Sequence, residues 1–423
     1  MYNNASIQAV DKSRFSKRFV KPLYDSYCFS KIPDTILQLL TGKAKAPLPV
    51  DVVGGSWEKA DVVVVFLVDG FGWDFFQRFG KNQPFLRRYE ESGVVSKITS
   101  EFPSTTAAHV TTIHSGLDVG ESGIYEWFYY EPLVDKIISP LTFSYAGDHR
   151  LDTLLESKID PSSFYPQKTF YQDLEEKGIK SFVFQQEGIS DSVYSKMLTR
   201  GAKIIPFGRF QDGLQKVAEV CKEASGPTYL FFYLGDIDAV GHRQGIESDR
   251  FYDTIDACWK GFEECFAKSL KTNGKKVATI VTADHGMVGV NPQTTHYLNQ
   301  VFPDICDFFK RNRQGEPLVP AGSCRDFFLH VEEKHFTSCK DLLEKRFQSV
   351  AEIYATEDLI GKGFFGPNPS QKFKSRVGNL VILPYENESI WWFSKHKFEQ
   401  HFHAAHGGLE KKEMESIFLF LSW

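Results

Sequence analysis

The 423-residue chain lacks the marks of several large protein classes. Its seven cysteines are odd in number, scattered, and never form a Cys-x-x-Cys pair, so neither a disulfide framework nor a thiolate zinc site is indicated. Its net charge is −5, so the excess of basic residues expected of a protein that binds duplex nucleic acid is absent. Internal repeats and low-complexity tracts are also missing.

Long apolar runs are absent too. No stretch reaches the length of a transmembrane span, and residues 1–18 lack the apolar core of a secretory signal. We therefore expect a protein without a transmembrane segment, cytoplasmic by default, with signal-independent secretion as the alternative. With 42% apolar and 24% charged residues, the composition is typical of a globular protein with a large core. The sequence does not set the oligomeric state.

Three apolar runs read as strands that end beside metal-binding side chains. Val62–Val68 is continuous and β-branched, as expected of a strand buried on both faces of a parallel sheet. It is followed by Asp69 and Gly70. Similar runs cover residues 229–234 and 279–282. Ligands of open α/β sheets bind beyond the carboxyl ends of the strands, so we expect these three ends to line one site.

The donors after the second and third runs have spacings suited to divalent cations. Asp238 and His242 form an Asp-x-x-Gly-His sequence, and Asp284 is followed directly by His285. His406 ends a further histidine-rich stretch that also contains His401 and His403. Carboxylate and imidazole together suit zinc, with manganese as an alternative. A surface turn would explain any one of these clusters, but their combination favours a two-metal site.

The stretch Pro103-Ser104-Thr105-Thr106 precedes a predicted helix. Its hydroxyls can cap that helix, and the free N–H groups of the first turn attract phosphate. A hydroxyl near the positive helix end and a metal ion loses its proton more easily, which makes it a nucleophile. Simple capping is the alternative explanation for a single threonine.

The order of predicted elements indicates an α/β fold with a central, mostly parallel sheet sandwiched by helices. Residues 181–184 and 203–206 add strands, and Ser248 begins a helix with one apolar face. The 120 residues between His285 and His406 are too many for one loop, which predicts an inserted cap. Strand-like runs at 379–383 and 417–421 are expected to close the fold. The expected units are a lead-in packed on the core (1–55), a catalytic core (56–290 and 376–423) and the cap (291–375).

This ordered set resembles the type I phosphodiesterase and nucleotide pyrophosphatase branch of the alkaline phosphatase superfamily, over residues 62 to about 410. The resemblance implies an alkaline-phosphatase-like fold and two divalent cations. One would be held by Asp238, His242 and His406, and the other by Asp69, Asp284, His285 and Thr106. Counting back from Ser115-Gly116 selects Thr106 over Thr105 as the nucleophile.

Two positions depart from the family pattern. Relatives with Phe-Pro-Asn after the threonine use the asparagine to contact a phosphoryl oxygen, whereas this chain has Ala107-Ala108-His109. We expect His109 to take that role, or the contact to be missing. Asp236-Ile237 replaces the glutamate-proline that precedes the metal aspartate in many relatives. Both departures concern the substrate class more than the reaction type.

The resemblance implies a metal-dependent hydrolase of a small-molecule phosphodiester or nucleotide, acting through a phosphothreonine. A phosphomonoesterase or phosphomutase would need cationic side chains near Thr106, and only Arg325, in the cap, could supply one. A sulfatase is less favoured, since no Cys/Ser-x-Pro-x-Arg sequence is present. The alternative from another class is an inactive binding protein on the same fold, against which the complete donor set argues.

Aromatic residues between 125 and 130 allow two interpretations. Tyr125 and Trp127 could stack on a base or another substituent of the substrate, or they could belong to a half-buried strand. Short basic runs at 372–376 and 395–397 could meet a phosphate tail, although a solvated face is the more common explanation.

Overall fold

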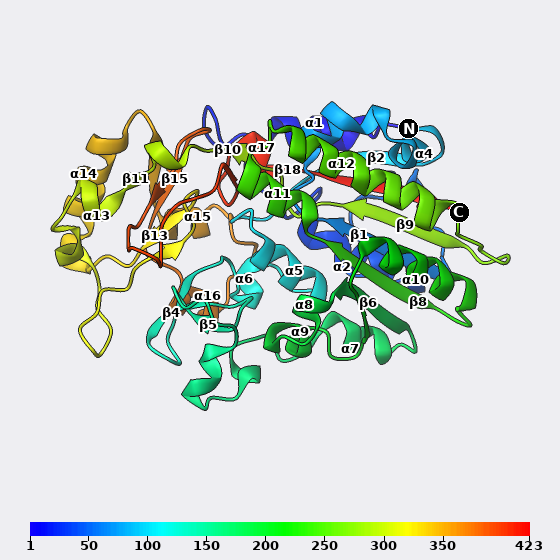
Figure 1. Ribbon diagram of the computed structural model, residues 1–423, viewed down its shortest axis with the longest axis horizontal. Coiled ribbons are helices and arrows are strands. Elements are labelled where there is room, and N and C mark those ends of the chain that lie inside the picture. Colours follow the sequence, from blue (N-terminus) through cyan, green and yellow to red (C-terminus); the bar gives the residue numbers. More distant parts are fainter.

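The computed structural model describes residues 1–423 and has a central sheet of seven strands in the order β2-β18-β9-β1-β8-β6-β7 (Figure 1). These strands are β1 (Val62–Val68), β2 (Val94–Thr99), β6 (Lys180–Gln186), β7 (Lys203–Phe207), β8 (Thr228–Leu234), β9 (Val277–Thr282) and β18 (Glu415–Ser422). β1 lies parallel to β8 and β9, and β6 lies parallel to β7 and β8. β18 runs antiparallel to both of its neighbours, β2 and β9. Every residue of β1 is buried, as its continuous apolar run predicted.

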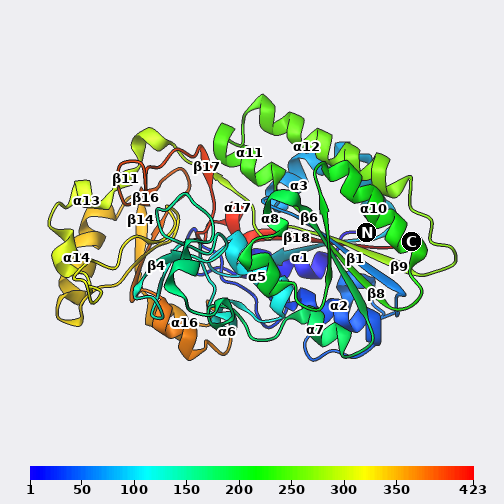
Figure 2. The same cartoon turned by 60° about the horizontal axis from the view of Figure 1, so that its bottom comes forward.

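Helices cover both faces of this sheet, which confirms the predicted α/β sandwich (Figure 2). One face packs against α3 (Trp73–Phe79), α4 (Pro84–Ser92), α10 (Phe210–Glu223) and α12 (Asp249–Gly261). The other packs against α2 (Ile32–Thr41), α5 (Thr106–Ser115), α7 (Phe170–Glu175) and α9 (Val193–Leu198). Alternate residues of β1 point into the two cores because successive side chains of a strand face opposite ways. Shorter helices are α6 (Val119–Ser122), α8 (Glu187–Ser190), α11 (Asp236–Gln244) and α17 (Lys411–Met414).

A second, smaller unit lies at the far left of Figure 1 and has its own core. Its sheet contains β12 (Ala321–Gly322), β13 (Phe327–Leu329), β15 (Leu380–Pro384) and β14 (Ala351–Ala355), all antiparallel to their neighbours. Its core includes residues of α13 (Leu298–Val301) and α14 (Phe336–Phe347). Leu359 of α15 (Thr356–Gly361) and Phe373 of α16 (Gln371–Arg376) are instead buried in the larger core that contains α5. β15 pairs with β13 and β14, whereas the sequence assigned this run to the closing strands of the core. The unit therefore continues past residue 375.

The second unit leaves and rejoins the core at one point. β10 (Val288–Gly289) pairs antiparallel with β17 (Ala404–Ala405), with Val288 opposite Ala405. We call the chain between these two strands, residues 290–403, the insertion. The pairing returns His406 to the end of β9. The insertion also holds β11 (His296–Tyr297), which pairs with β16 (Ile390–Trp391).

The first 55 residues pack on the core through backbone and apolar contacts. α1 (Asn4–Lys12) lies beside β2, where the Asn3 N–H donates to the Val95 carbonyl at 2.8 Å. Val10, Phe19 and Phe29 are buried in the same core as α2. A small sheet of β3 (Tyr129–Glu131), β4 (Lys136–Ser139) and β5 (Ser144–Tyr145) lies beyond α6. None of the helices combines the length and apolar character needed to span a bilayer.

Candidate active site

The site begins where neighbouring parallel strands end together. Asp69 follows β1 directly, and Asp284 follows β9 by two residues. The Asp284 Oδ1 accepts hydrogen bonds from the N–H groups of Gly70 at 3.1 Å and His285 at 3.0 Å. Gly70 has a φ of +74°, and a Cβ there would lie 3.1 Å from the Cβ of Asp238. A glycine is therefore required for the close approach of these two loops.

Asp69, Asp284 and His285 form a first cluster, which we call the threonine-side group. Their ligand atoms lie within 4.8 Å of one another, and all three side chains are buried. The His285 Nε2 is 3.4 Å from Asp69 Oδ1 and 3.3 Å from Asp284 Oδ2. This is the geometry of a candidate cation site with two carboxylates and one imidazole.

Thr106 is the first residue of α5, and its hydroxyl faces the threonine-side group. The Thr106 Oγ1 lies 3.2 Å from His285 Nε2 and 3.4 Å from Asp69 Oδ2. Thr105 has the capping role instead, because its Oγ1 accepts from the Ala108 N–H and donates to the Tyr125 carbonyl. The two neighbouring threonines thus have different surroundings, and Thr106, which the resemblance selected, is the one that faces the threonine-side group.

Asp238, His242 and His406 form a second cluster, which we call the helix-side group because two members lie on α11. The Asp238 Oδ1 is 3.4 Å from His242 Nε2 and 3.5 Å from His406 Nε2. The two imidazole Nε2 atoms are 3.1 Å apart. His285 stacks on His406 with ring centroids 3.5 Å apart, so it touches both groups. The structure thus brings together all seven donors that the sequence singled out.

Burial determines the charge state of these groups. It raises the pKa of Asp69 well above its usual value, with the charges of Asp284 and Asp238 adding to the effect. Burial likewise raises the pKa of Asp238. It lowers the pKa of His285 and of His406 well below the usual value, so both imidazoles are neutral at pH 7. Neutral imidazoles beside crowded carboxylates are what a divalent cation needs as ligands.

Within the site, two buried carboxylate oxygens have no hydrogen-bond partner, namely Asp238 Oδ1 and Asp284 Oδ2. A buried, unpartnered carboxylate is costly unless a cation or a donor satisfies it. The residues present therefore fit a pair of divalent cations.

The histidines are oriented by hydrogen bonds to the main chain. The Nδ1 of His242 bonds the Ala404 carbonyl at 2.7 Å, and the Nδ1 of His406 bonds the Ser104 carbonyl at 2.9 Å. Donation from Nδ1 leaves each Nε2 as the acceptor that faces the cluster. His401 is exposed and lies beside Glu399, which places it outside the cluster.

Tyr233 supports the threonine-side group and was missed in the sequence. Its hydroxyl donates to Asp69 Oδ2 at 2.5 Å. Burial and the charge of Asp69 raise the pKa of Tyr233 well above its usual value, so the phenol stays a donor. Its only sign in the sequence was a tyrosine hydroxyl near the end of an otherwise apolar strand.

His109 does not have a free ring nitrogen for a substrate. Its Nε2 accepts from the Glu101 N–H at 2.9 Å, and its Nδ1 bonds the Thr105 carbonyl at 2.7 Å. The buried ring packs edge-on against Phe29. In this arrangement the histidine holds the loop before Thr106 rather than a phosphoryl oxygen.

The three expected substrate contacts have different environments. Tyr125 is fully buried and stacks on Tyr129 with ring centroids 5.4 Å apart. Arg325 is also fully buried and pairs with Glu413 at 2.9 Å. Neither lies where a substrate can reach it, since both are part of the packed interior. Trp127 is 41% exposed and is the one that remains available.

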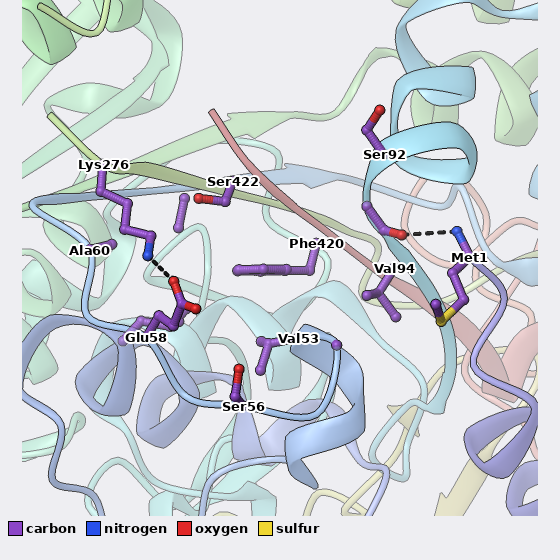
Figure 3. A pocket seen from close by; sticks show the side chains of 14 residues that line it. Met1, Val53, Ser56, Glu58, Ala60, Ser92, Val94, Lys276, Phe420 and Ser422 are labelled. Atoms are coloured by element: carbon purple, nitrogen blue, oxygen red, sulfur yellow. Dashed lines mark hydrogen bonds and ion pairs between the residues drawn. The ribbon is translucent and has the colours of Figure 1, made fainter. Parts of the chain in front are cut away.

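A separate cavity of about 330 Å³ lies at the other end of the parallel strands (Figure 3). Ala60, before β1, and Lys276, before β9, line it together with Phe420. Lys276 forms an ion pair with Glu58 at its edge. Its position at the amino ends of these strands separates it from the metal-binding side chains at their carboxyl ends.

Comparison with known proteins identifies the family to which this fold and this set of donors belong. The family model for type I phosphodiesterase / nucleotide pyrophosphatase matches residues 63–409, and the chain belongs to this family. No curated protein sequence matches the chain.

Similar solved structures share the fold at low sequence identity. Murine ectonucleotide pyrophosphatase / phosphodiesterase 5 has a TM-score of 0.63 and 19% identity over 85% of this chain and 87% of its own. Its inactive variant in complex with AMP has a TM-score of 0.61 and 20% identity over 86% and 88%. The human protein of the same name has a TM-score of 0.61 and 19% identity over 85% and 87%.

Proposed function

We propose that the protein hydrolyses a phosphodiester or nucleotide pyrophosphate with Thr106 as nucleophile and two divalent cations, zinc by preference. The observation that carries this proposal is the position of the Thr106 hydroxyl. It lies at the first turn of α5, 3.2 Å from His285 Nε2 and 3.4 Å from Asp69 Oδ2. A hydroxyl used only for capping would instead bond the N–H groups of its own helix, as that of Thr105 does.

The two groups of side chains would each hold one cation. The threonine-side group, with the Thr106 hydroxyl, offers one set of ligands, and the helix-side group offers the other. Bound cations supply Lewis-acid charge, which lowers the pKa of the nucleophile and stabilises charge on phosphoryl oxygens. Zinc is favoured by the imidazole-rich helix-side group, and manganese would also suit the carboxylates.

The reaction would proceed in two displacements. Thr106 Oγ loses its proton to solvent and forms a bond to phosphorus as the bond between phosphorus and the leaving oxygen breaks. The leaving alcohol or phosphate takes up a proton from solvent. Water then attacks phosphorus, the bond from phosphorus to Oγ breaks, the monoester is released, and Oγ regains a proton from solvent. The positive end of α5 favours the anionic group held beside its first residue.

A diester is preferred to a monoester because no extra fixed positive charge faces Thr106. The guanidinium of Arg325, which could have favoured a dianion, is paired with Glu413. Nucleotide substrates are consistent with the similar fold of the protein described in complex with AMP. Trp127, exposed two residues after the Tyr125 carbonyl that Thr105 contacts, is our candidate for a substrate contact on the threonine side.

The proposal can be tested with zinc-loaded enzyme and two chromogenic esters. We expect kcat/KM for bis(4-nitrophenyl) phosphate to exceed that for 4-nitrophenyl phosphate by well over tenfold, which is ~1.4 kcal/mol of transition-state preference. Better turnover of the monoester would assign the protein to the phosphomonoesterases. No turnover of either ester, with both cations bound, would favour the inactive binding protein.

A further inference from the structure

We propose that Phe402 contacts the leaving group of the substrate and selects for a flat, apolar one. This inference rests on the proposed function and deepens it. Phe402 is 45% exposed, and its ring centroid lies 4.5 Å from that of His242, a member of the helix-side group. The phenyl ring therefore forms an apolar surface directly beside a candidate metal ligand.

The backbone holds Phe402 in this position. The Phe402 N–H donates to Gln400 Oε1 at 3.2 Å, and the His403 N–H donates to the His242 carbonyl at 2.8 Å. The Val290 N–H in turn donates to the His403 carbonyl at 3.0 Å. The segment is thus fixed to both α11 and the start of the insertion. A phenyl ring held in this way keeps 45% of its surface exposed and therefore open to a ligand.

The side of the site on which Phe402 lies identifies the part of the substrate that it meets. Thr106 approaches phosphorus from the threonine-side group, because its hydroxyl contacts Asp69 and His285. In an in-line displacement the leaving oxygen departs opposite the attacking oxygen. The helix-side group then faces the leaving oxygen, and the ring of Phe402, which lies against that of His242, faces the atoms attached to this oxygen. The substituent that stays on phosphorus lies off this line.

A flat ring fits this position better than a branched alkyl or a charged group. Aromatic rings pack favourably in offset or edge-on geometry, and the ring of Phe402 lies at 44° to that of His242. The exposed histidines His401 and His403 flank Phe402 in the sequence, so the apolar surface is narrow. We therefore expect a preference for aryl or nucleobase-like leaving groups over aliphatic ones of the same acidity.

The test compares two methyl diesters whose leaving alcohols have similar acidity, phenol and hexafluoroisopropanol. We expect Phe402→Ala to lower kcat/KM for methyl phenyl phosphate about tenfold, and that for methyl hexafluoroisopropyl phosphate less than about threefold. Phe402→Tyr keeps the ring and should retain the selectivity. Equal losses on both diesters, or no loss on either, would overturn the inference.

Metal content separates a substrate contact from mere support of His242. Phe402→Ala should bind the same number of zinc ions per chain as the wild type, by elemental analysis of dialysed protein. Loss of one zinc ion in this variant would make the ring a support for His242 and would overturn the inference.

A binding measurement distinguishes failure of this inference from failure of the proposed function. The measurement uses zinc-loaded Thr106→Ala protein with and without Phe402→Ala. Calorimetry should show that Phe402→Ala raises the Kd of methyl phenyl phosphate about tenfold and leaves the Kd of dimethyl phosphate unchanged. If this difference appears but the wild type hydrolyses no diester, the contact stands and the hydrolase proposal fails. If the wild type hydrolyses diesters but the difference is absent, only the inference about Phe402 fails.

Discussion

The two donor groups of the site differ in how the chain builds them. The threonine-side group comes from the ends of two adjacent parallel strands, and its side chains are at most 3% exposed. The helix-side group joins a helix to a residue beyond the insertion, and its side chains are 12% to 17% exposed. The register of the sheet fixes the first group, whereas the second also requires the insertion to return His406. The first should therefore be the more rigid, and the second the more sensitive to distant changes.

The largest effect is expected at Thr106, the proposed nucleophile beside the threonine-side group. Thr106→Ala should lower kcat by roughly 10⁴-fold or more while folding and zinc content are kept, because the hydroxyl is removed but the buried ligands remain. Steady-state kinetics and elemental analysis would check this, and intact-mass analysis of trapped enzyme should find a phosphoryl adduct on Thr106. Thr105→Ser is the matched control, since it keeps the capping hydroxyl. An active Thr106→Ala enzyme would remove the residue from the mechanism.

Removal of a ligand from the helix-side group should show that the two groups bind different zinc ions. His406→Ala should lose mainly one zinc ion and at least about 10³-fold in kcat/KM, or ~4 kcal/mol of transition-state stabilisation. Its effect on thermal stability should be smaller than that of Asp284→Ala, which opens the fully buried group. His403→Ala, in the same segment but exposed, is the control. Full occupancy of both ions in His406→Ala would contradict the assignment of this residue.

Acidification should release zinc from both groups of donors. Burial raises the pKa of Asp238 to about 6 and that of Asp69 well above its usual value. A raised carboxyl pKa means that protons compete with zinc already at mildly acidic pH, so affinity falls as pH drops through it. The lowered pKa values of His285 and His406 keep the imidazoles available over the same range. Zinc titrations from pH 8 to pH 5 should show the zinc affinity of both groups falling with pH, and an affinity that is unchanged at pH 5 would contradict this prediction.

The smallest expected effect tests the support of Asp69. Tyr233→Phe removes the hydroxyl that donates to Asp69 Oδ2. Loss of a hydrogen bond that orients a metal ligand costs about 10- to 100-fold in activity or metal affinity. Tyr229→Phe is a matched control on the same strand, because the Tyr229 hydroxyl is buried without a partner. Zinc affinity and kcat/KM should fall in the first variant only. If zinc affinity and kcat/KM were the same in the two variants, the hydrogen bond from Tyr233 to Asp69 would contribute nothing to metal binding or activity.

The difference between the groups also explains what could be predicted from the sequence. Short-range patterns were sufficient for β1, whose predicted bounds match the structure, and for the strand-end donors Asp69 and Asp284. Such patterns do not report long-range pairing. They therefore assigned β15 to the wrong sheet. They also gave no sign that Glu413 would form an ion pair with Arg325, or that the Glu101 N–H would donate to His109 Nε2. The contact of Phe402 with His242 was missed for the same reason, since 160 positions separate them.

The pairing of β10 with β17 has a consequence for how this protein could be remodelled. Gly289 and Ala404 lie opposite each other, so the insertion begins and ends at adjacent points of the core. The free-energy cost of closing a loop grows only slowly with its length, so the core tolerates a long segment here about as well as a short one. The insertion is nevertheless not a free module, because Phe328, Phe365 and Phe373 are buried in the same core as α5. A domain that replaced it would need adjacent termini and also apolar side chains to fill this part of the core.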